Sequence, residues 1–133
     1  MSEPRIKLAL LGDGWWTLTL EFPGHPPVMC RTDASRPIPE AFVRWLDELA
    51  AGRIPAPIRM DEEPQEVVIG VAETDDPETV RLTVTRDPVN GQSVAVLIDL
   101  QVDCWELAKG LDSALEMIGR SLQGTEATRD WLA

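Results

Sequence analysis

The sequence predicts an α+β fold, a two-layer sandwich in which two helices pack on one face of a mostly antiparallel, six-stranded sheet. Six segments alternate apolar and polar residues with the period of half-buried strands. Two further segments place apolar residues at helical spacing. The segments follow the order βββα, a connection, and βββα, with short turn signals that favour antiparallel neighbours. We expect residues 1–133 to form one domain, because this length is typical of a single hydrophobic core.

The first two strands are predicted to form a hairpin across Gly12-Asp13-Gly14. Residues 5–11 and 15–22 each place alternate apolar side chains on one face. A three-residue loop aligns these faces, because glycine readily adopts the positive φ that such a loop needs. The predicted pairs are Leu10 with Trp16, Leu8 with Leu18, and Ile6 with Leu20. A turn at residues 23–27 then returns the chain, so that Val28 and Cys30 share this face.

Residues 39–51 are predicted to form the first helix. Pro39 suits the first helical turn, and Gly52 suits the position after the last turn. The apolar stripe consists of Phe42, Leu46 and Leu49. A proline-containing connection follows at residues 53–64.

Residues 66–72, 79–86 and 92–102 are predicted to form the remaining strands. A turn at residues 74–77 would set Val71 opposite Val80 and Ile69 opposite Leu82. Asn90-Gly91 is typical of a two-residue turn, but only a loop of three or five residues aligns the apolar faces. That loop would pair Val84 with Val96 and Leu82 with Ile98. The last strand would direct five residues to the core: Val94, Val96, Ile98, Leu100 and Val102.

Residues 104–122 carry the clearest helical pattern. Asp103 is the predicted N-cap, with Glu106 three residues later as in a capping box. The apolar stripe consists of Leu107, Leu111, Leu115, Ile118 and Leu122. In the tail, residues 125–133, Trp131 and Leu132 are expected to dock on the rest of the domain.

The chain is strongly acidic, with 23 Asp and Glu against 12 Lys and Arg and a formal net charge of −11. A field of this sign repels phosphate groups, which disfavours nucleic acids and anionic membranes as partners. The acidity suits solubility or a basic partner. No secretory signal or membrane span is recognisable, and Cys30 and Cys104 lie far apart. We therefore expect reduced thiols and a cytoplasmic protein, and the excess of Arg over Lys is common in GC-rich bacterial genomes.

The sequence contains no recognisable motif for catalysis, cofactor binding or metal binding. One histidine and two distant cysteines give no zinc pattern, and the acidic clusters at residues 61–63 and 75–78 lack EF-hand spacing. His25 has no recognisable orienting partner for work as a base, and no G-x-S-x-G motif is present. The glycines at positions 12 and 14 lack the following helix of a phosphate-binding loop. We therefore expect no cofactor, no metal and no enzymatic activity.

The outer face of the predicted sheet carries more apolar residues than a solvated face should. Such a face is normally polar, and an apolar patch on it indicates contact with another protein or a second copy. The first hypothesis is therefore a non-enzymatic protein that acts by protein–protein contact, as a homodimer or an adaptor. The predicted contact residues are Leu11, Trp15, Met29, Val68 and Leu97.

Two alternatives remain open. One is an immunity-type inhibitor that neutralises a basic toxin or other basic partner with its carboxylates. The acidic residues predicted for this contact are Asp61, Glu62, Glu63, Asp75 and Asp76. The other alternative is a small-ligand binder with a cleft between helix and sheet. A deep pocket lined by Cys104, Trp105 or His25 would favour it.

Overall fold

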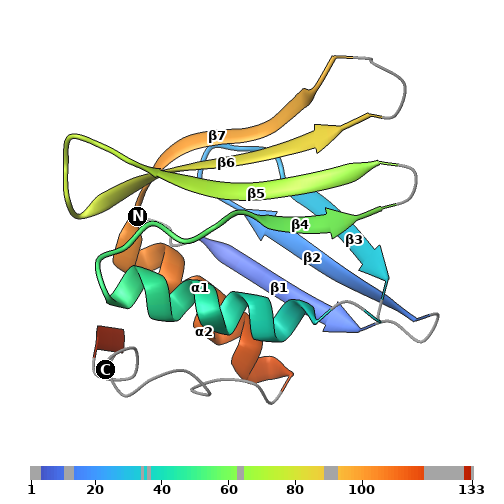
Figure 1. The fold of residues 1–133 in the computed structure, drawn as a ribbon, viewed down its shortest axis with the longest axis horizontal. Helices are drawn as coiled ribbons and strands as arrows, with labels where there is room; N and C mark the ends of the chain where they lie inside the picture. Colours follow the sequence, from blue (N-terminus) through green and yellow to red (C-terminus); the bar gives the residue numbers. More distant parts are fainter. Residues whose placement is uncertain are drawn as a thin grey trace.

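The computed structural model describes residues 4–10, 14–33, 35, 37–62, 65–88, 93–118 and 131–132 (Figure 1). Seven strands and two helices lie within these ranges, and the predicted α+β class is confirmed. In chain order they are β1 (Arg5–Leu10), β2 (Trp15–Glu21), β3 (Val28–Asp33), α1 (Ile38–Ala50), β4 (Ile58–Asp61), β5 (Glu66–Glu73), β6 (Thr79–Asp87), β7 (Ala95–Asp103) and α2 (Cys104–Met117).

The strands form two antiparallel sheets in place of the single six-stranded sheet that the sequence predicts. The first sheet has the order β1-β2-β3 and the second the order β4-β5-β6-β7. The unpredicted strand, β4, lies within the segment 53–64 that was expected to be a connection. Ile58 and Met60 are buried while Arg59 between them is exposed, which is the alternation of a half-buried strand. With only four residues and prolines just before it, β4 is too short for its period to stand out in the sequence.

The predicted register of the first sheet is confirmed. Leu10 pairs with Trp16, Leu8 with Leu18, and Ile6 with Leu20. Gly14 has a φ of +86°, a conformation that glycine adopts without steric cost. β3 continues the same face, because Leu18 pairs with Cys30 and Leu20 with Val28.

The predicted pairing of β5 with β6 is wrong by two residues. The structure pairs Val71 with Leu82 and Ile69 with Val84. The turn is longer than expected. The hydroxyl groups of Thr74 and Thr79 bond each other at 2.6 Å, and the hydroxyl that does not donate in this bond donates to the carbonyl of Asp76, which lies 2.7 Å from the Thr74 oxygen and 3.2 Å from the Thr79 oxygen. A shift of two residues leaves every side chain on its predicted face, so the core face of β6 remains correct.

β6 and β7 also pair two residues from the prediction, with Leu82 opposite Leu100 and Val84 opposite Ile98. The register then shifts, so that Thr85 pairs with Val96 and Leu97 is an extra residue in a β-bulge. Val96, predicted in the core, is therefore 64% exposed, while Leu97, predicted on the outer face, packs against the core. Val94 is exposed as well. The Asn90-Gly91 loop lies outside the described residues.

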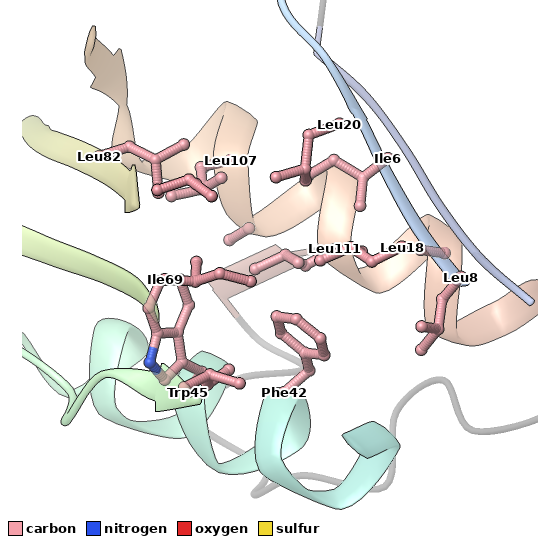
Figure 2. Packing of buried hydrophobic residues seen from close by; sticks show 14 of the residues in the cluster. Ile6, Leu8, Leu18, Leu20, Phe42, Trp45, Ile69, Leu82, Leu107 and Leu111 are labelled. Carbon is pink, nitrogen blue, oxygen red and sulfur yellow. The ribbon is translucent and has the colours of Figure 1, made fainter. Parts of the chain in front are cut away.

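One hydrophobic core joins both sheets and both helices. Figure 2 shows its side chains converging from β1 and β2, from α1 and α2, and from the second sheet. Trp45 lies within this core, and its indole Nε1–H donates to the carbonyl of Ala56 at 2.7 Å. That bond satisfies the polar atom of a buried tryptophan and holds the chain leading to β4 against α1.

The second helix begins as predicted. The Asp103 carboxylate accepts a hydrogen bond of 2.9 Å from the backbone N–H of Glu106. α2 ends at Met117, and residues 119–122 of the predicted helix lie outside the described residues. Leu132 is buried and the carbonyl of Trp131 accepts a bond from the indole of Trp105, which confirms the docking of these two residues. Neither helix in the described part of the chain is long and apolar enough to cross a membrane.

Candidate functional site

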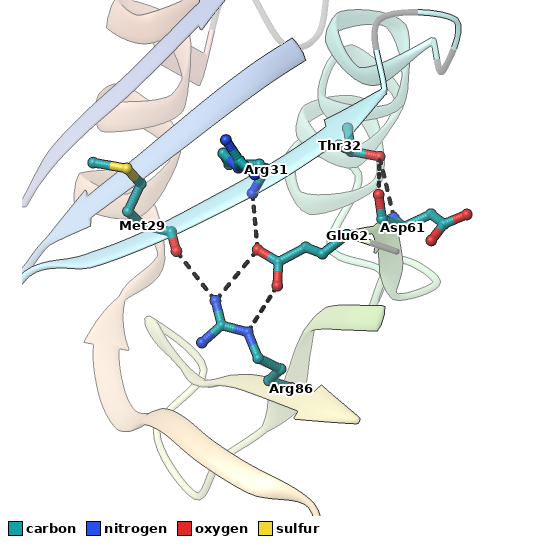
Figure 3. Close-up of polar contacts among 6 residues, drawn as sticks. All are labelled: Met29, Arg31, Thr32, Asp61, Glu62 and Arg86. Carbon is teal, nitrogen blue, oxygen red and sulfur yellow. Dashed lines mark hydrogen bonds and ion pairs between the residues drawn. The ribbon is translucent and has the colours of Figure 1, made fainter. Parts of the chain in front are cut away.

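The two sheets meet at a polar joint between β3 and β4 (Figure 3). The hydroxyl of Thr32, which is buried, donates to the carbonyl of Asp61 and accepts from its backbone N–H, both at 3.1 Å. One side chain thus satisfies a donor and an acceptor of β4 that would otherwise need another strand. Asp61, predicted as an acidic contact residue, is therefore fixed in the joint by its main chain.

Glu62 and Arg86 form the most buried ion pair found within the described residues. Nε of Arg86 lies 2.7 Å from the Glu62 carboxylate, and the side chains of Arg86 and Glu62 are 28% and 13% exposed. Figure 3 shows that Glu62 also accepts from the backbone N–H of Arg31 at 2.9 Å, while Arg86 donates to the carbonyl of Met29 at 3.3 Å. Both main-chain groups belong to β3, so the pair caps its edge in place of a neighbouring strand. Glu62, predicted to meet a partner, instead bonds within the protein.

Cys30 lies close to this joint and is fully buried. Burial raises the pKa of its thiol to about 12, and the Glu62 charge adds to the increase more than the Arg86 charge offsets it. Burial and the charge of Asp103 also raise the pKa of the Cys104 thiol. Both residues are free cysteines that stay protonated near neutral pH, so neither has the thiolate character of a nucleophile.

The acidic residues predicted to meet a basic partner lie at two ends of the second sheet. Asp61 pairs with Glu66 at the start of β5, whereas Asp75 and Asp76 follow Glu73 at its end. The rise of an eight-residue strand separates the two ends by about 23 Å. Glu63 lies outside the described residues. The five residues therefore do not form one acidic surface.

Asp75 and Asp76 line a hollow of about 320 Å³ between the end of α1, the β5–β6 turn and Cys104. An adjoining hollow of about 500 Å³ shares Cys104 and is also lined by Trp105. Cys104 and Trp105 line this second hollow, but it is open to the surface and not the deep pocket that the ligand-binding hypothesis asks for, and His25 lines neither hollow. The carboxylates around the two hollows are Glu73, Asp75, Asp76, Glu78, Asp103 and Glu106.

Trp15 and Met29 lie on the face of the first sheet that points away from the core. Trp15 is half-buried and Met29 is 58% exposed. The guanidinium carbon of Arg31 lies 5.1 Å from the centre of the Trp15 ring, in a cation–π contact. We call this surface the first-sheet outer face; it consists of Arg5, Lys7, Ala9, Trp15, Thr17, Thr19, Glu21, Met29, Arg31 and Asp33.

The remaining predicted contact residues do not join Trp15 and Met29. Val68 lies on the outer face of the second sheet, where it pairs with Thr85. Leu97 packs against the core, and Leu11 lies outside the described residues. The structure therefore places two of the five predicted contact residues on one described face, together with Arg31, which is not among the five.

Among the described residues, no group of three or more His, Cys, Asp or Glu side chains is placed to hold a metal ion. His25 lies in the turn before β3, where its ring Nδ1–H donates to the carbonyl of Pro26 at 2.7 Å. The contacts found for His25 in the described part of the chain include no carboxylate that would orient it as a base.

Comparison of the chain with known protein families, with curated proteins and with solved structures finds no match in any of the three. Function is therefore inferred from the geometry of the chain itself.

The structure brings together a group of basic residues that was not predicted from the sequence. Arg5, Lys7 and Lys109 line a hollow of about 230 Å³ between β1 and α2. Within the described residues these three make no ion pair, whereas Arg53, Arg59, Arg81 and Arg86 each do. The exposed positions of Arg5 and Lys7 follow from alternation in β1. Their closeness to Lys109 depends on how α2 packs beside β1, which the sequence pattern does not specify.

Proposed function

We propose that this protein acts by protein–protein contact and binds an acidic partner through the first-sheet outer face. The observation that carries the proposal is the stacking of Arg31 on Trp15 beside the exposed Met29. Trp, Arg and Met are residue types enriched in protein interfaces, and Trp and Arg provide many of the side chains that dominate binding energy. An Arg stacked on an aromatic ring is also partly ordered before binding, which lowers the entropy lost on contact.

The sign of the charge on this face supports an acidic partner. The face carries the cations Arg5, Lys7 and Arg31 against the carboxylates Glu21 and Asp33, so it is net positive, although the whole chain carries −11. Lys7 and Arg31 are exposed on it and make no ion pair among the described residues. An acidic partner would be attracted here and repelled by most of the remaining surface. Such a field steers the orientation of encounter as well as its rate.

The size of the face favours a reversible contact. Three strands of six or seven residues cover about 20 Å by 14 Å, or roughly 300 Å². A stable interface buries about 800 Å² on each partner. We therefore propose an adaptor in preference to an obligate homodimer, with no catalytic step. We place it in the cytoplasm, where the free thiols of Cys30 and Cys104 would stay reduced.

Photo-cross-linking in cells tests this proposal. A photoreactive phenylalanine analogue at Met29 should capture one acidic protein, and the same analogue at exposed Val94 should not. Adding Trp15→Ala to the Met29 probe should remove the product. Capture of a second copy of this chain alone, or the same products from both positions, would contradict an acidic partner at this face. Light scattering during size-exclusion chromatography gives the oligomeric state independently.

A basic partner at the two acidic hollows is the second candidate. The observation in its favour is the set of carboxylates around Cys104, combined with apolar lining residues such as Leu49 and Val80. This surface suits the immunity-type inhibitor, whose carboxylates would meet a basic protein. The photoreactive analogue at Glu73 should then capture a basic protein, and Asp75→Lys should remove that product. Capture from Met29 and none from Glu73 excludes this candidate.

A further inference from the structure

We infer that the groove between β1 and α2 binds an extended acidic segment of the partner, which adds as a further strand to the edge of β1. The inference rests on the proposed function, because it assumes an acidic protein partner and specifies how that partner is recognised. We call this surface the β1–α2 groove; the lining residues that matter here are Arg5, Lys7, Trp105, Lys109, Ser113 and Met117.

The first wall of the groove is an edge strand. Among the described residues, β1 pairs with β2 alone, so its other side has no neighbouring strand (Figure 1). Alternate N–H and C=O groups on such an edge lack a ladder partner and can bond to an added strand. Recognition of this kind uses main-chain hydrogen bonds for affinity and side-chain contacts for specificity.

The second wall is an exposed ridge of α2. Trp105, Lys109, Ser113 and Met117 are spaced four residues apart and are all exposed, so they form one row along the helix. The rise from Trp105 to Met117 is about 18 Å, which matches about five residues of extended chain. Gly110 lets the helix approach β1 closely, because a Cβ atom there would lie 3.1 Å from Cδ1 of Ile6.

The charge of the groove selects an acidic segment. Arg5, Lys7 and Lys109 come from both walls and make no ion pair in the described residues. Lys109 stacks on the Trp105 ring, with Nζ 4.7 Å from the ring centre. Glu106 is the carboxylate of the lining, so the groove remains net positive on a chain of −11. Carboxylates at alternate positions of an added strand would lie near these cations.

Apolar side chains at the ends of the ridge add a second element of specificity. Met117 is 80% exposed and Trp105 is also exposed, whereas Leu107, Leu111 and Leu115 of the same helix are buried in the core. Met and Trp are adaptable, high-area contacts for apolar side chains. The groove therefore suits a segment in which acidic residues alternate with aliphatic ones.

Fluorescence anisotropy with a synthetic peptide tests the inference. The probe is a capped, fluorescein-labelled octapeptide of alternating Glu and Val. We expect it to bind, and we expect Lys109→Glu and Lys7→Glu each to weaken binding by about tenfold. Ser113→Lys adds a cation to the groove and should strengthen binding about threefold. A misfolded variant would lose binding, so stronger binding by Ser113→Lys could not be caused by misfolding. Arg44→Glu makes the same charge change at an exposed position of α1; it is the matched control and should have little effect.

A second probe separates strand addition from simple charge attraction. The same octapeptide with N-methyl groups at alternate residues keeps its carboxylates but loses main-chain donors, and should bind at least tenfold more weakly. Amide NMR shifts on binding should concentrate in β1 and α2. Equal binding of the N-methylated peptide, or equal loss with Arg44→Glu, would overturn the inference. So would absence of binding, in which case Arg5 and Lys7 merely prevent copies from pairing at this edge.

The two proposals fail in different ways. If Arg31→Glu and Trp15→Ala abolish peptide binding while Lys109→Glu leaves it unchanged, the acidic partner docks on the first-sheet outer face and the groove is excluded. If Lys109→Glu reduces binding while Arg31→Glu and Trp15→Ala leave it unchanged, the inference stands; Lys7 borders both surfaces, so Lys7→Glu does not separate them. Cross-linking from the Met29 probe then tests, independently of the peptide, whether the partner also contacts the first-sheet outer face.

Discussion

Arg86 reaches from β6 to Glu62 beyond β4, and the ion pair they form at 2.7 Å caps the edge of β3. The Glu62 carboxylate accepts a hydrogen bond from the backbone N–H of Arg31, and the Arg86 guanidinium donates one to the carbonyl of Met29. At this position a neighbouring strand would normally supply both partners. The pair thus satisfies β3 with side chains and holds the two sheets together where main-chain pairing does not.

The Glu62–Arg86 pair should contribute measurably to stability. Glu62→Gln removes the charge but keeps the shape, which leaves the guanidinium of Arg86 partly buried without a counter-charge. We expect a loss of about 2 kcal/mol in the free energy of unfolding, measured by urea denaturation. Asp99→Asn breaks the exposed Arg81–Asp99 pair and should change stability little. Equal losses from the two variants would contradict a special role for the joint.

Stability should fall in alkaline solution because of Cys30. Its folded-state pKa of about 12 lies above the ordinary value of 9.0, so its contribution is complete below pH 9 and is lost as the pH rises toward 12. One proton corresponds to a slope of about 1.4 kcal/mol per pH unit in that interval. Urea denaturation at several pH values should show this slope in the wild type and a shallower one in Cys30→Ala. The same slope in both proteins would assign the effect to other groups.

Two threonine substitutions should have opposite effects. Thr32→Val removes the hydroxyl that bonds both main-chain groups of Asp61, and should cost about 1–2 kcal/mol. Thr17→Val removes a hydroxyl whose buried oxygen has no hydrogen-bond partner among the described residues, so stability should be unchanged or rise by up to about 1 kcal/mol. Both are changes from hydroxyl to methyl in β-branched side chains. Thermal and urea unfolding would disprove the assignment if Thr17→Val were the more damaging.

The β-bulge in β7 reverses the effects that simple alternation predicts. Leu97→Ala removes a side chain that packs against the core and should destabilise the protein by about 1.5 kcal/mol. Val96→Thr changes an exposed position and should have an effect close to zero. Urea denaturation of the two variants distinguishes the bulged strand from a regular one, in which Val96 would be the buried residue.

Local pattern was sufficient for both helices, for every strand except β4 and for much of the core. Alternation in β1 and β2, together with a glycine turn, specified their register, because a short loop leaves only one alignment of the apolar faces. The N-cap of α2 was equally readable, since Asp103 and Glu106 act within one turn of helix. Trp15 and Met29 were assigned to an outer face by the same two-residue period.

Only the tertiary structure decided the division into two sheets, the register of β5, β6 and β7, and the groove beside β1. A shift of two residues leaves the period of a strand unchanged, so alternation alone leaves the longer turn at Thr74 and Thr79 undetected. The bulge at Leu97 shifts the alternation of β7 by one residue, so that Leu97 faces the core and Val96 faces solvent. The joint of Glu62 with Arg86 and the gathering of Lys109 with Arg5 and Lys7 link distant parts of the chain. Local periodicity determines which way each side chain faces, whereas packing between elements determines which side chains meet.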